Sequence, residues 1–175
     1  MFKLLTTTCY NSSNSIEVLK PFLQIANRGD FDFSHYCSYV FACCFFMEKK
    51  DIRLLASEIL YEKIGSRSFP IEQMSAVFAY LISNNYGVFG RFADAVLSIK
   101  DSSPLHNQAL FLLLDGVLSN WTLGEKLPTN FKKFIENYYD LATKLNLKPS
   151  EKAKQFLMPF QENTSLKKLV NLLIK

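Results

Sequence analysis

The chain has 175 residues and a mass of 20.1 kDa, which is the size of one ordinary domain. Hydrophobic residues make up 49% and charged residues 21%, with 6 Gly and 6 Pro, and this composition excludes a disordered tail, a collagen-like repeat and a proline-rich linker. The 16 Phe and 8 Tyr predict a core rich in aromatic rings. We therefore expect one domain that covers residues 1–175.

The net charge of +4 is unevenly distributed. Residues 1–124 carry ten basic and eleven acidic side chains, whereas residues 125–175 carry ten lysines and five acidic side chains. This excess is lysine without arginine, and lysine is less suited than arginine to bidentate contacts with phosphate. A solvated surface is the preferred interpretation, and nucleic acid is the alternative partner. Apart from Lys126, the lysines are Lys132, Lys133, Lys144, Lys148, Lys152, Lys154, Lys167, Lys168 and Lys175.

The beginning of the chain, residues 1–10, does not have the basic start and the apolar run of about 7 to 15 residues that a signal peptide requires. The uncharged run over residues 33–47 is shorter than the roughly 20 residues that cross a bilayer. Three of the four cysteines lie in that run, which disfavours a disulfide framework. We predict a cytoplasmic protein without membrane contact, in which Cys9, Cys37, Cys43 and Cys44 are reduced thiols.

Apolar residues recur at spacings of three and four, which predicts helices in succession along the chain. The first extends from Asn14, which forms a capping-box pattern with Glu17, to Gly29. Pro21 either kinks this helix or marks a later start. The second is capped by Asp32 and covers residues 33–47. Because it is apolar on nearly all sides, we expect it to lie at the centre of the fold.

An amphipathic third helix is predicted from Asp51, as its cap, to Gly65. Proline in the first turn favours a fourth helix that begins at Pro70 and stops near residues 84–87. A fifth helix is expected over residues 88–100. A sixth begins at Ser103, where Ser followed by Pro is a typical helix start.

Residues 120–128 show no periodicity and are the longest predicted loop. Beyond it we expect a helix over 131–145, a short helix from Ser150 to Pro159, and a last helix capped within 163–165. The total is eight or nine helices in an all-α fold, arranged as a single globular bundle or as stacked helical hairpins. In the second arrangement the second, fourth and sixth helices, which are the more apolar, would form the inner layer.

No segment has the residue spacing of a known catalytic or cofactor-binding motif. The sequence lacks the hydrolase elbow, the phosphate-binding loop and paired zinc ligands. His35 lies near Cys37, but the cysteines are better interpreted as small buried thiols. We predict no catalytic residue, no cofactor and no metal site; an enzyme built on unrecognised carboxylates is an alternative.

Surface aromatic residues are the most suggestive feature, since Tyr and Trp anchor many protein interfaces. Trp121 lies in the predicted loop, and Tyr139, Tyr86 and Tyr61 lie off the predicted apolar faces. An acidic patch is predicted from Asp30, Asp32, Glu48, Asp51 and Glu58. The proposed partner-binding residues are Trp121, Tyr139, Tyr86, Asp30 and Asp32.

In size, helix content and lack of catalytic motifs, the whole chain resembles the small all-helical immunity proteins with which bacteria neutralise a cognate toxin domain, including those of contact-dependent growth inhibition. No residue motif carries this resemblance. It implies direct one-to-one binding to one protein partner, a toxin domain. A helical scaffold within a larger assembly and a nucleic-acid accessory protein are the competing hypotheses.

Overall fold

The computed structural model describes residues 15–84, 89–97, 103–122 and 127–175. Helix accounts for 75% of these residues, which contain no strand, so the all-α prediction is confirmed for them. The elements in this part of the chain are α2 (Ser15–Ala26), α3 (His35–Cys44), α4 (Lys50–Ile64), α5 (Ile71–Asn84), α6 (Phe89–Leu97), α7 (Pro104–Asn120), α8 (Phe131–Leu145), α9 (Glu151–Leu157), the 3-10 helix η2 (Met158–Glu162) and α10 (Lys167–Ile174).

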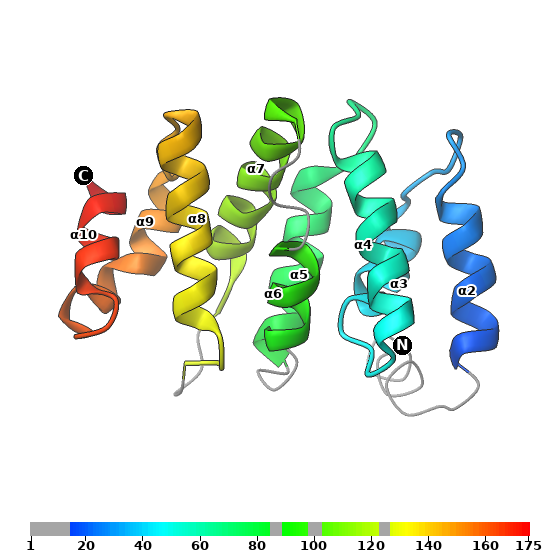
Figure 1. The fold of residues 1–175 in the computed structure, drawn as a ribbon, viewed down its shortest axis with the longest axis horizontal. Helices are drawn as coiled ribbons and strands as arrows, with labels where there is room; N and C mark the ends of the chain where they lie inside the picture. Colours follow the sequence, from blue (N-terminus) through cyan, green and yellow to red (C-terminus); the bar gives the residue numbers. More distant parts are fainter. Residues whose placement is uncertain (1–14, 85–88, 98–102, 123–126) are drawn as a thin grey trace.

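The helices alternate between two layers along an elongated row (Figure 1). Helices α2, α4, α6 and α8 contact one another in sequence and form the even layer, whereas α3, α5, α7 and α9 form the odd layer. Helix α10 and η2 pack together at one end of the row, against α8 and α9. Successive helices therefore alternate between the layers, and the more apolar helices α3, α5 and α7 share a layer, as expected for stacked hairpins. This layer has an exposed side, so it is not an inner one.

A continuous series of aromatic rings fills the space between the layers, and we call it the aromatic row. Neighbouring ring centroids are 4.8 to 6.3 Å apart, at which distance aromatic rings attract one another beyond simple area burial. The series accounts for much of the phenylalanine content and links α2 to η2. Its members in spatial order are Phe22, Phe31, Phe33, Phe41, Phe45, Phe78, Phe92, Phe89, Trp121, Phe156 and Phe160.

Helices α5 and α7 approach one another most closely where Gly116 faces Ser75. A Cβ atom added to Gly116 would lie only 2.7 Å from the Cβ of Ser75. Two small residues at this crossing therefore allow the two backbones to come together. Gly116 is not at a positive φ, so the reason for glycine here is space.

Three predicted helix starts are wrong, and one of them is the cap of the last helix within 163–165, because Leu166 is the N-cap of α10. Ser34, not Asp32, is the N-cap of α3, and Lys49, not Asp51, is the N-cap of α4. Asp51 lies inside the first turn, where a carboxylate still favours the helix dipole. Ser103 and Ser150 are confirmed as caps, because their hydroxyl oxygens accept from the backbone N–H three residues on, at 3.4 and 3.3 Å.

Helix α3 is buried as predicted, but it is not central. It lies in the hairpin next to one end of the row, and α5 and α7 occupy the middle (Figure 1). All side chains from Phe41 to Met47 are buried, because α3 packs against α2, α4 and α5. The burial of these side chains therefore comes from the three helices around α3, and α3 does not need a central position in the fold to be buried.

The described cysteines are free thiols. Cys43 and Cys44 are buried and Cys37 is half-buried, all as thiols; Cys9 lies outside these residues. No helix of the described part of the chain is long and apolar enough to span a membrane.

Candidate functional site

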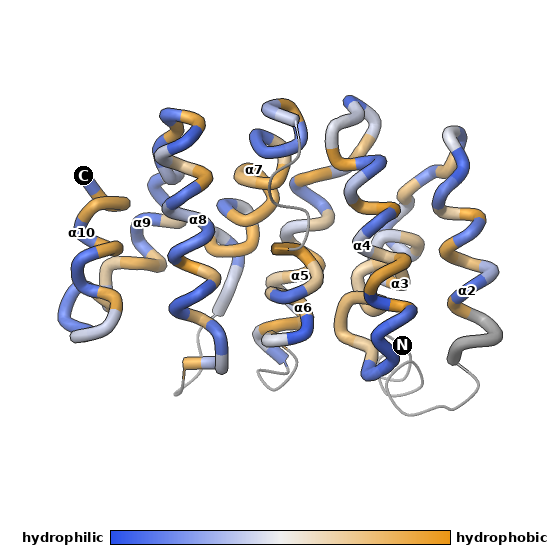
Figure 2. Tube along the Cα trace, viewed as in Figure 1, coloured by the Kyte–Doolittle hydropathy of each residue, from blue (hydrophilic) through white to orange (hydrophobic). Residues whose placement is uncertain are grey.

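Three helices of the odd layer, α3, α5 and α7, carry much less charge than the even layer, whereas the fourth, α9, carries Glu151, Lys152 and Lys154. Helix α3 carries no charged residue, α5 carries only Glu72 and α7 only Asp115. By contrast, blue hydrophilic and orange hydrophobic segments alternate along α4 and α8 in Figure 2. The charged residues of these two helices are Lys50, Asp51, Arg53, Glu58, Glu62, Lys63, Lys132, Lys133, Glu136, Asp140 and Lys144. A partner would meet a nearly uncharged surface on one side of the protein only.

Large apolar side chains are exposed on this uncharged surface. Tyr80 of α5 and Leu112 of α7 are each 48% exposed, and Leu105 is 59% exposed. These side chains lie away from the core, since Phe78 of α5 is in the aromatic row and α7 buries Leu110, Leu113, Leu114 and Val117. We call the exposed side of α3, α5 and α7 the odd face. Depletion of charge together with exposed tyrosine is typical of the centre of a protein–protein interface.

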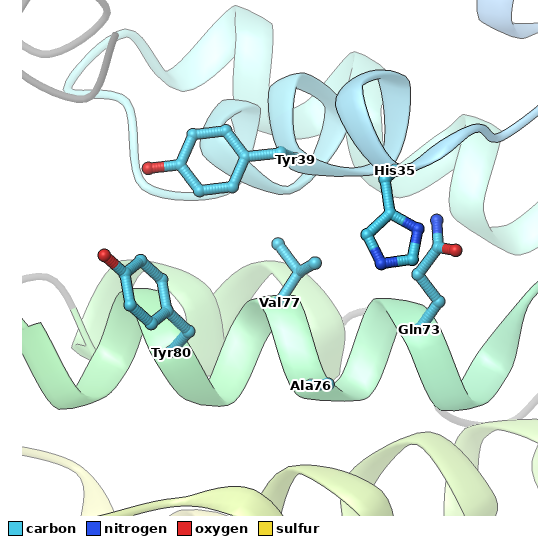
Figure 3. A pocket seen from close by; sticks show the side chains of 6 residues that line it. All are labelled: His35, Tyr39, Gln73, Ala76, Val77 and Tyr80. Carbon is cyan, nitrogen blue, oxygen red and sulfur yellow. The ribbon is translucent and has the colours of Figure 1, made fainter. Parts of the chain in front are cut away.

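A pocket of about 370 Å³ opens on the odd face between α3 and α5. Figure 3 shows His35 and Gln73 at one end of it and Tyr39 and Tyr80 at the other, with Val77 between them. Ala76 completes the lining. The pocket thus has apolar walls and hydrogen-bonding groups at both ends, and its lining includes no charged carboxylate, lysine or arginine.

The amide of Gln73 is held in place from both sides of the α3–α5 junction. Its Nε2 atom donates to the backbone oxygen of Phe33 at 2.9 Å and to the Oγ atom of Ser38 at 2.5 Å. Ser38 in turn donates to the same Phe33 oxygen at 3.1 Å. Both amide protons are therefore used, and the Oε1 atom is the group that Gln73 retains for accepting a hydrogen bond.

Asp115 of α7 belongs to a network between three helices. It accepts a short hydrogen bond from the hydroxyl of Tyr138 and another from the backbone N–H of Ser150 at 3.0 Å. Burial, together with the neighbouring Asp115 carboxylate, raises the pKa of Tyr138 above its ordinary value. The carboxylate therefore fastens α8 and the start of α9 to α7, and this role is structural.

Trp121 was expected at the surface, and this expectation is wrong. The indole is 5% exposed and stacks between Phe89 and Phe156, with centroid distances of 5.0 and 5.3 Å. At Trp121 the chain after α7 turns toward the core, and the indole fills the space between Phe89 of α6 and Phe156 of α9 in the aromatic row. Trp121 cannot anchor a partner without leaving the core.

The other proposed partner-binding residues have different positions. Tyr139 is half-buried against the core, and Asp30 and Asp32 are exposed in the connection between α2 and α3. Tyr86 lies outside the described residues. None of Tyr139, Asp30 and Asp32 lines the pocket on the odd face.

The wider acidic patch is partly neutralised. Asp51 pairs with Lys20 at 3.2 Å, and Glu48 pairs with Arg91 at 3.1 Å. The hydrogen bond from Lys20 lowers the pKa of Asp51 below its ordinary value. These contacts belong to the even layer and its loops, so the charges bind one another instead of forming one acidic surface.

Sequence reasoning missed Gln73, Ala76 and Tyr80. One signal was present: Ala76 and Tyr80 are four residues apart, opposite the apolar stripe of the same helix. That signal is common to solvent-facing helix residues. The pocket itself depends on how α3 lies against α5, which periodicity does not specify.

Several C-terminal lysines are engaged in ion pairs with nearby acidic residues. Lys132 pairs with Glu136, and Lys133 with Asp94 of the neighbouring helix α6. The other pairs are Lys154–Glu151 and Lys167–Glu162. These exposed contacts support the interpretation of the lysines as a solvated surface, where such pairs contribute little energy.

Two further pockets lie outside the odd face. One of about 460 Å³ lies between the start of α8 and the turn before α10, beside Lys132 and Lys133. The other, of about 140 Å³, lies between α4 and α6 beside Arg53 and Asp94. Within the described residues, no group of three or more His, Cys, Asp or Glu side chains could hold a metal ion.

The fold and the odd face define a two-layer stack of helical hairpins with one nearly uncharged surface. The chain belongs to the DUF7825 family, a domain of unknown function, and the family match spans residues 1–175. No curated protein and no solved structure matches the chain.

Proposed function

We propose that this chain is a non-catalytic protein-binding domain that holds one folded protein partner on the odd face. The observation that carries the proposal is the difference in charge between these three helices and the even layer. Helices α3, α5 and α7 together contain two charged residues, Glu72 and Asp115, whereas α4 alone contains six. Charged side chains are depleted at the centres of protein interfaces because their desolvation is costly.

The same face is a poor surface for nucleic acid. Binding to phosphates requires lysine or arginine, and α3, α5 and α7 contain neither. Lysines are present on α8 and α10, but several of them already pair with acidic neighbours. A protein partner accounts better for exposed Tyr80 and Leu112 than a polyanion does.

The resemblance to toxin-immunity proteins supplies a specific candidate for the partner, a toxin domain encoded beside this chain. This candidate rests on overall size and helix content. The uncharged odd face supports it in one respect, because immunity proteins act by direct binding. The cytoplasmic location belongs to the same proposal.

The test is co-expression of the chain with each protein encoded beside it, followed by co-purification in about 0.5 M salt. A partner bound through the odd face should survive this salt concentration, because apolar burial is not screened. A complex of standard size would bury about 1,200–2,000 Å² in total.

Two leucines with equal exposure provide a matched pair of variants. Leu112 of α7 and Leu54 of α4 are both 48% exposed, but only Leu112 lies on the odd face. Leu112→Glu should weaken the complex at least about tenfold, since it places an unpaired charge in the interface. Leu54→Glu should leave it unchanged. Equal loss in both variants, or salt-sensitive capture of RNA or DNA with no protein partner, would contradict the proposal.

A further inference from the structure

Helix α2 carries a proline in its interior, as no other helix of the described residues does. Pro21 is the seventh of the twelve residues Ser15–Ala26. Proline has no N–H, so the backbone carbonyl of Glu17 loses its helical donor, and the pyrrolidine ring also crowds that carbonyl. Pro104 of α7 and Pro159 of η2 lie instead in the first turn, where proline is well tolerated. The hydrogen bonding of α2 is therefore the weaker, and the helix depends on packing against its neighbours.

This packing involves one side of α2. The helix lies at the end of the row and packs against α4 and α3 (Figure 1). The polar contacts are exposed ones: Lys20 pairs with Asp51 at 3.2 Å, and the Nζ atom of Lys63 donates to the backbone oxygen of Arg28 at 2.5 Å. Exposed pairs of this kind contribute little energy. Apolar burial is the main contribution, and the side chains of residues 19–26 that supply it are Leu19, Leu23 and Ala26.

The start of α3 is anchored independently of α2. The backbone oxygen of Phe33 accepts hydrogen bonds from Gln73 of α5 at 2.9 Å and from Ser38 at 3.1 Å. The ring of Phe33 also packs against Phe69, with the centroids 5.3 Å apart. Residues 27–30, by contrast, are exposed. A movement of α2 can therefore take place in the connection before Phe33 while α3 keeps its contacts with α5.

We infer that α2 is a releasable cover: because its interior proline weakens it, the helix detaches from α3 and α4 as a unit while α3 to α10 stay folded. Each element of a helical stack contacts mainly its neighbours, so an end helix can open without unfolding the middle of the stack. Release uncovers the apolar surface against which Leu19 and Leu23 pack. It does not involve the odd face and does not depend on partner binding there.

Native-state hydrogen exchange of the full chain, followed by NMR in urea below the unfolding transition, tests the release. The backbone amides of Leu23 and Ala26 report on α2, and those of Leu113 and Leu114 report on α7. We expect the α2 amides to be protected at least about tenfold less than the α7 amides and to depend less on urea, since their opening exposes less surface. The same protection and urea dependence in both helices would overturn the inference. Different urea dependences for Leu23 and Ala26 would also overturn it, because they would indicate fraying instead of release as a unit.

Val117→Ala separates release of α2 from unfolding of the whole chain. Val117 is fully buried in α7, and the loss of two methyl groups should lower the protection of the α7 amides about tenfold or more. If α2 opens by itself, the protection of Leu23 stays unchanged in this variant. An equal fall in both helices would mean that α2 opens only when the whole protein unfolds.

Pro21→Ala tests the part that the proline has in the release. The new N–H can donate to the carbonyl of Glu17, so the protection of the Leu23 amide should rise at least about tenfold. Pro104→Ala, at the first position of α7, is the matched control and should leave that protection unchanged. Circular dichroism shows whether both variants fold. Equal protection of Leu23 in the wild type and Pro21→Ala would refute the role assigned to the proline.

Discussion

The helices of both layers pack one side against the same core, but most of them differ between the layers in the charge of the side chains that they expose. Helices α3, α5 and α7 of the odd layer contain two charged residues between them, whereas α4 and α8 of the even layer contain many, and even-layer residues form ion pairs such as Lys20–Asp51. An amphipathic helix needs only one packed side, so charge on its other side is neutral for folding. Exposed apolar side chains contribute little to folding, and those on α5 and α7 are the basis of the binding role that we propose.

The largest effect on stability should arise between the layers, in the aromatic row. Phe41 is fully buried and contacts Phe33 and Phe45. Phe41→Ala should lower the free energy of unfolding by about 3–5 kcal/mol, because it removes transfer energy and leaves a cavity. Tyr36→Ala on the same helix, at a side chain 50% exposed, should change it by less than about 0.5 kcal/mol. Urea titration measures both, and similar losses would mean that the row is not the common core of the two layers.

A second effect tests the close approach within the odd layer. Gly116→Ala should cost about 1–3 kcal/mol, because the new methyl group collides with Ser75 and separates α5 from α7. Gly29→Ala is the control, since nothing lies within 4 Å of a Cβ at that position. In the Gly116→Ala background, Ser75→Gly should restore part of the loss. Thermal unfolding of the three variants would refute the steric explanation if no rescue occurs.

The network that joins α7 of the odd layer to α8 of the even layer gives a third, smaller effect. Tyr138→Phe should cost about 1–2 kcal/mol at neutral pH, because Asp115 loses its hydroxyl donor. Burial raises the pKa of Tyr138 in the folded protein, so its contribution is complete below the unfolded pKa of about 10 and is lost as the pH rises above it.

The alkaline limb of a stability profile checks this sign. The wild-type protein should lose stability above about pH 10 more steeply than Tyr138→Phe, by up to about 1.4 kcal/mol per pH unit. Parallel profiles for the wild type and Tyr138→Phe would contradict the assigned pKa direction.

The sequence predicted the helices well because local signals specify them. Ser103 and Ser150 are capping residues whose hydroxyls accept hydrogen bonds from backbone N–H groups of their own helix. The alternation of more apolar and more amphipathic helices along the chain predicted the two layers. Asp32 and Asp51 were misassigned as caps, since the N-cap positions are Ser34 and Lys49, two residues away, and neither forms a side-chain cap hydrogen bond. A helix end can shift in this way without changing the fold.

The candidate site was much less predictable, for reasons of long-range packing. Tryptophan is a residue type that is common at interfaces, but Trp121 packs in the core between Phe89 and Phe156. The Gln73 amide becomes part of a pocket only because α3 brings Phe33 and Ser38 beside it, 40 and 35 residues away in the chain. No periodicity within α5 contains that information.

The smallest effect is expected in the charged layer, where the Lys20–Asp51 pair joins α2 to α4 at 3.2 Å. The hydrogen bond from Lys20 lowers the pKa of Asp51 below the ordinary value of 3.8, so any stabilisation from it is present above that pH and is lost as the pH falls through the folded pKa. Both side chains are about half exposed, which screens the pair. Lys20→Met should therefore raise the Asp51 pKa in an NMR titration of its carboxyl carbon, and added salt should raise it in the wild type. Lys49→Met, at an exposed position before the same helix, should shift that pKa less, and neither variant should move the urea midpoint measurably. A clear loss of stability in Lys20→Met alone would show that charge pairs of the even layer hold the stack together, contrary to the division of roles between the two layers.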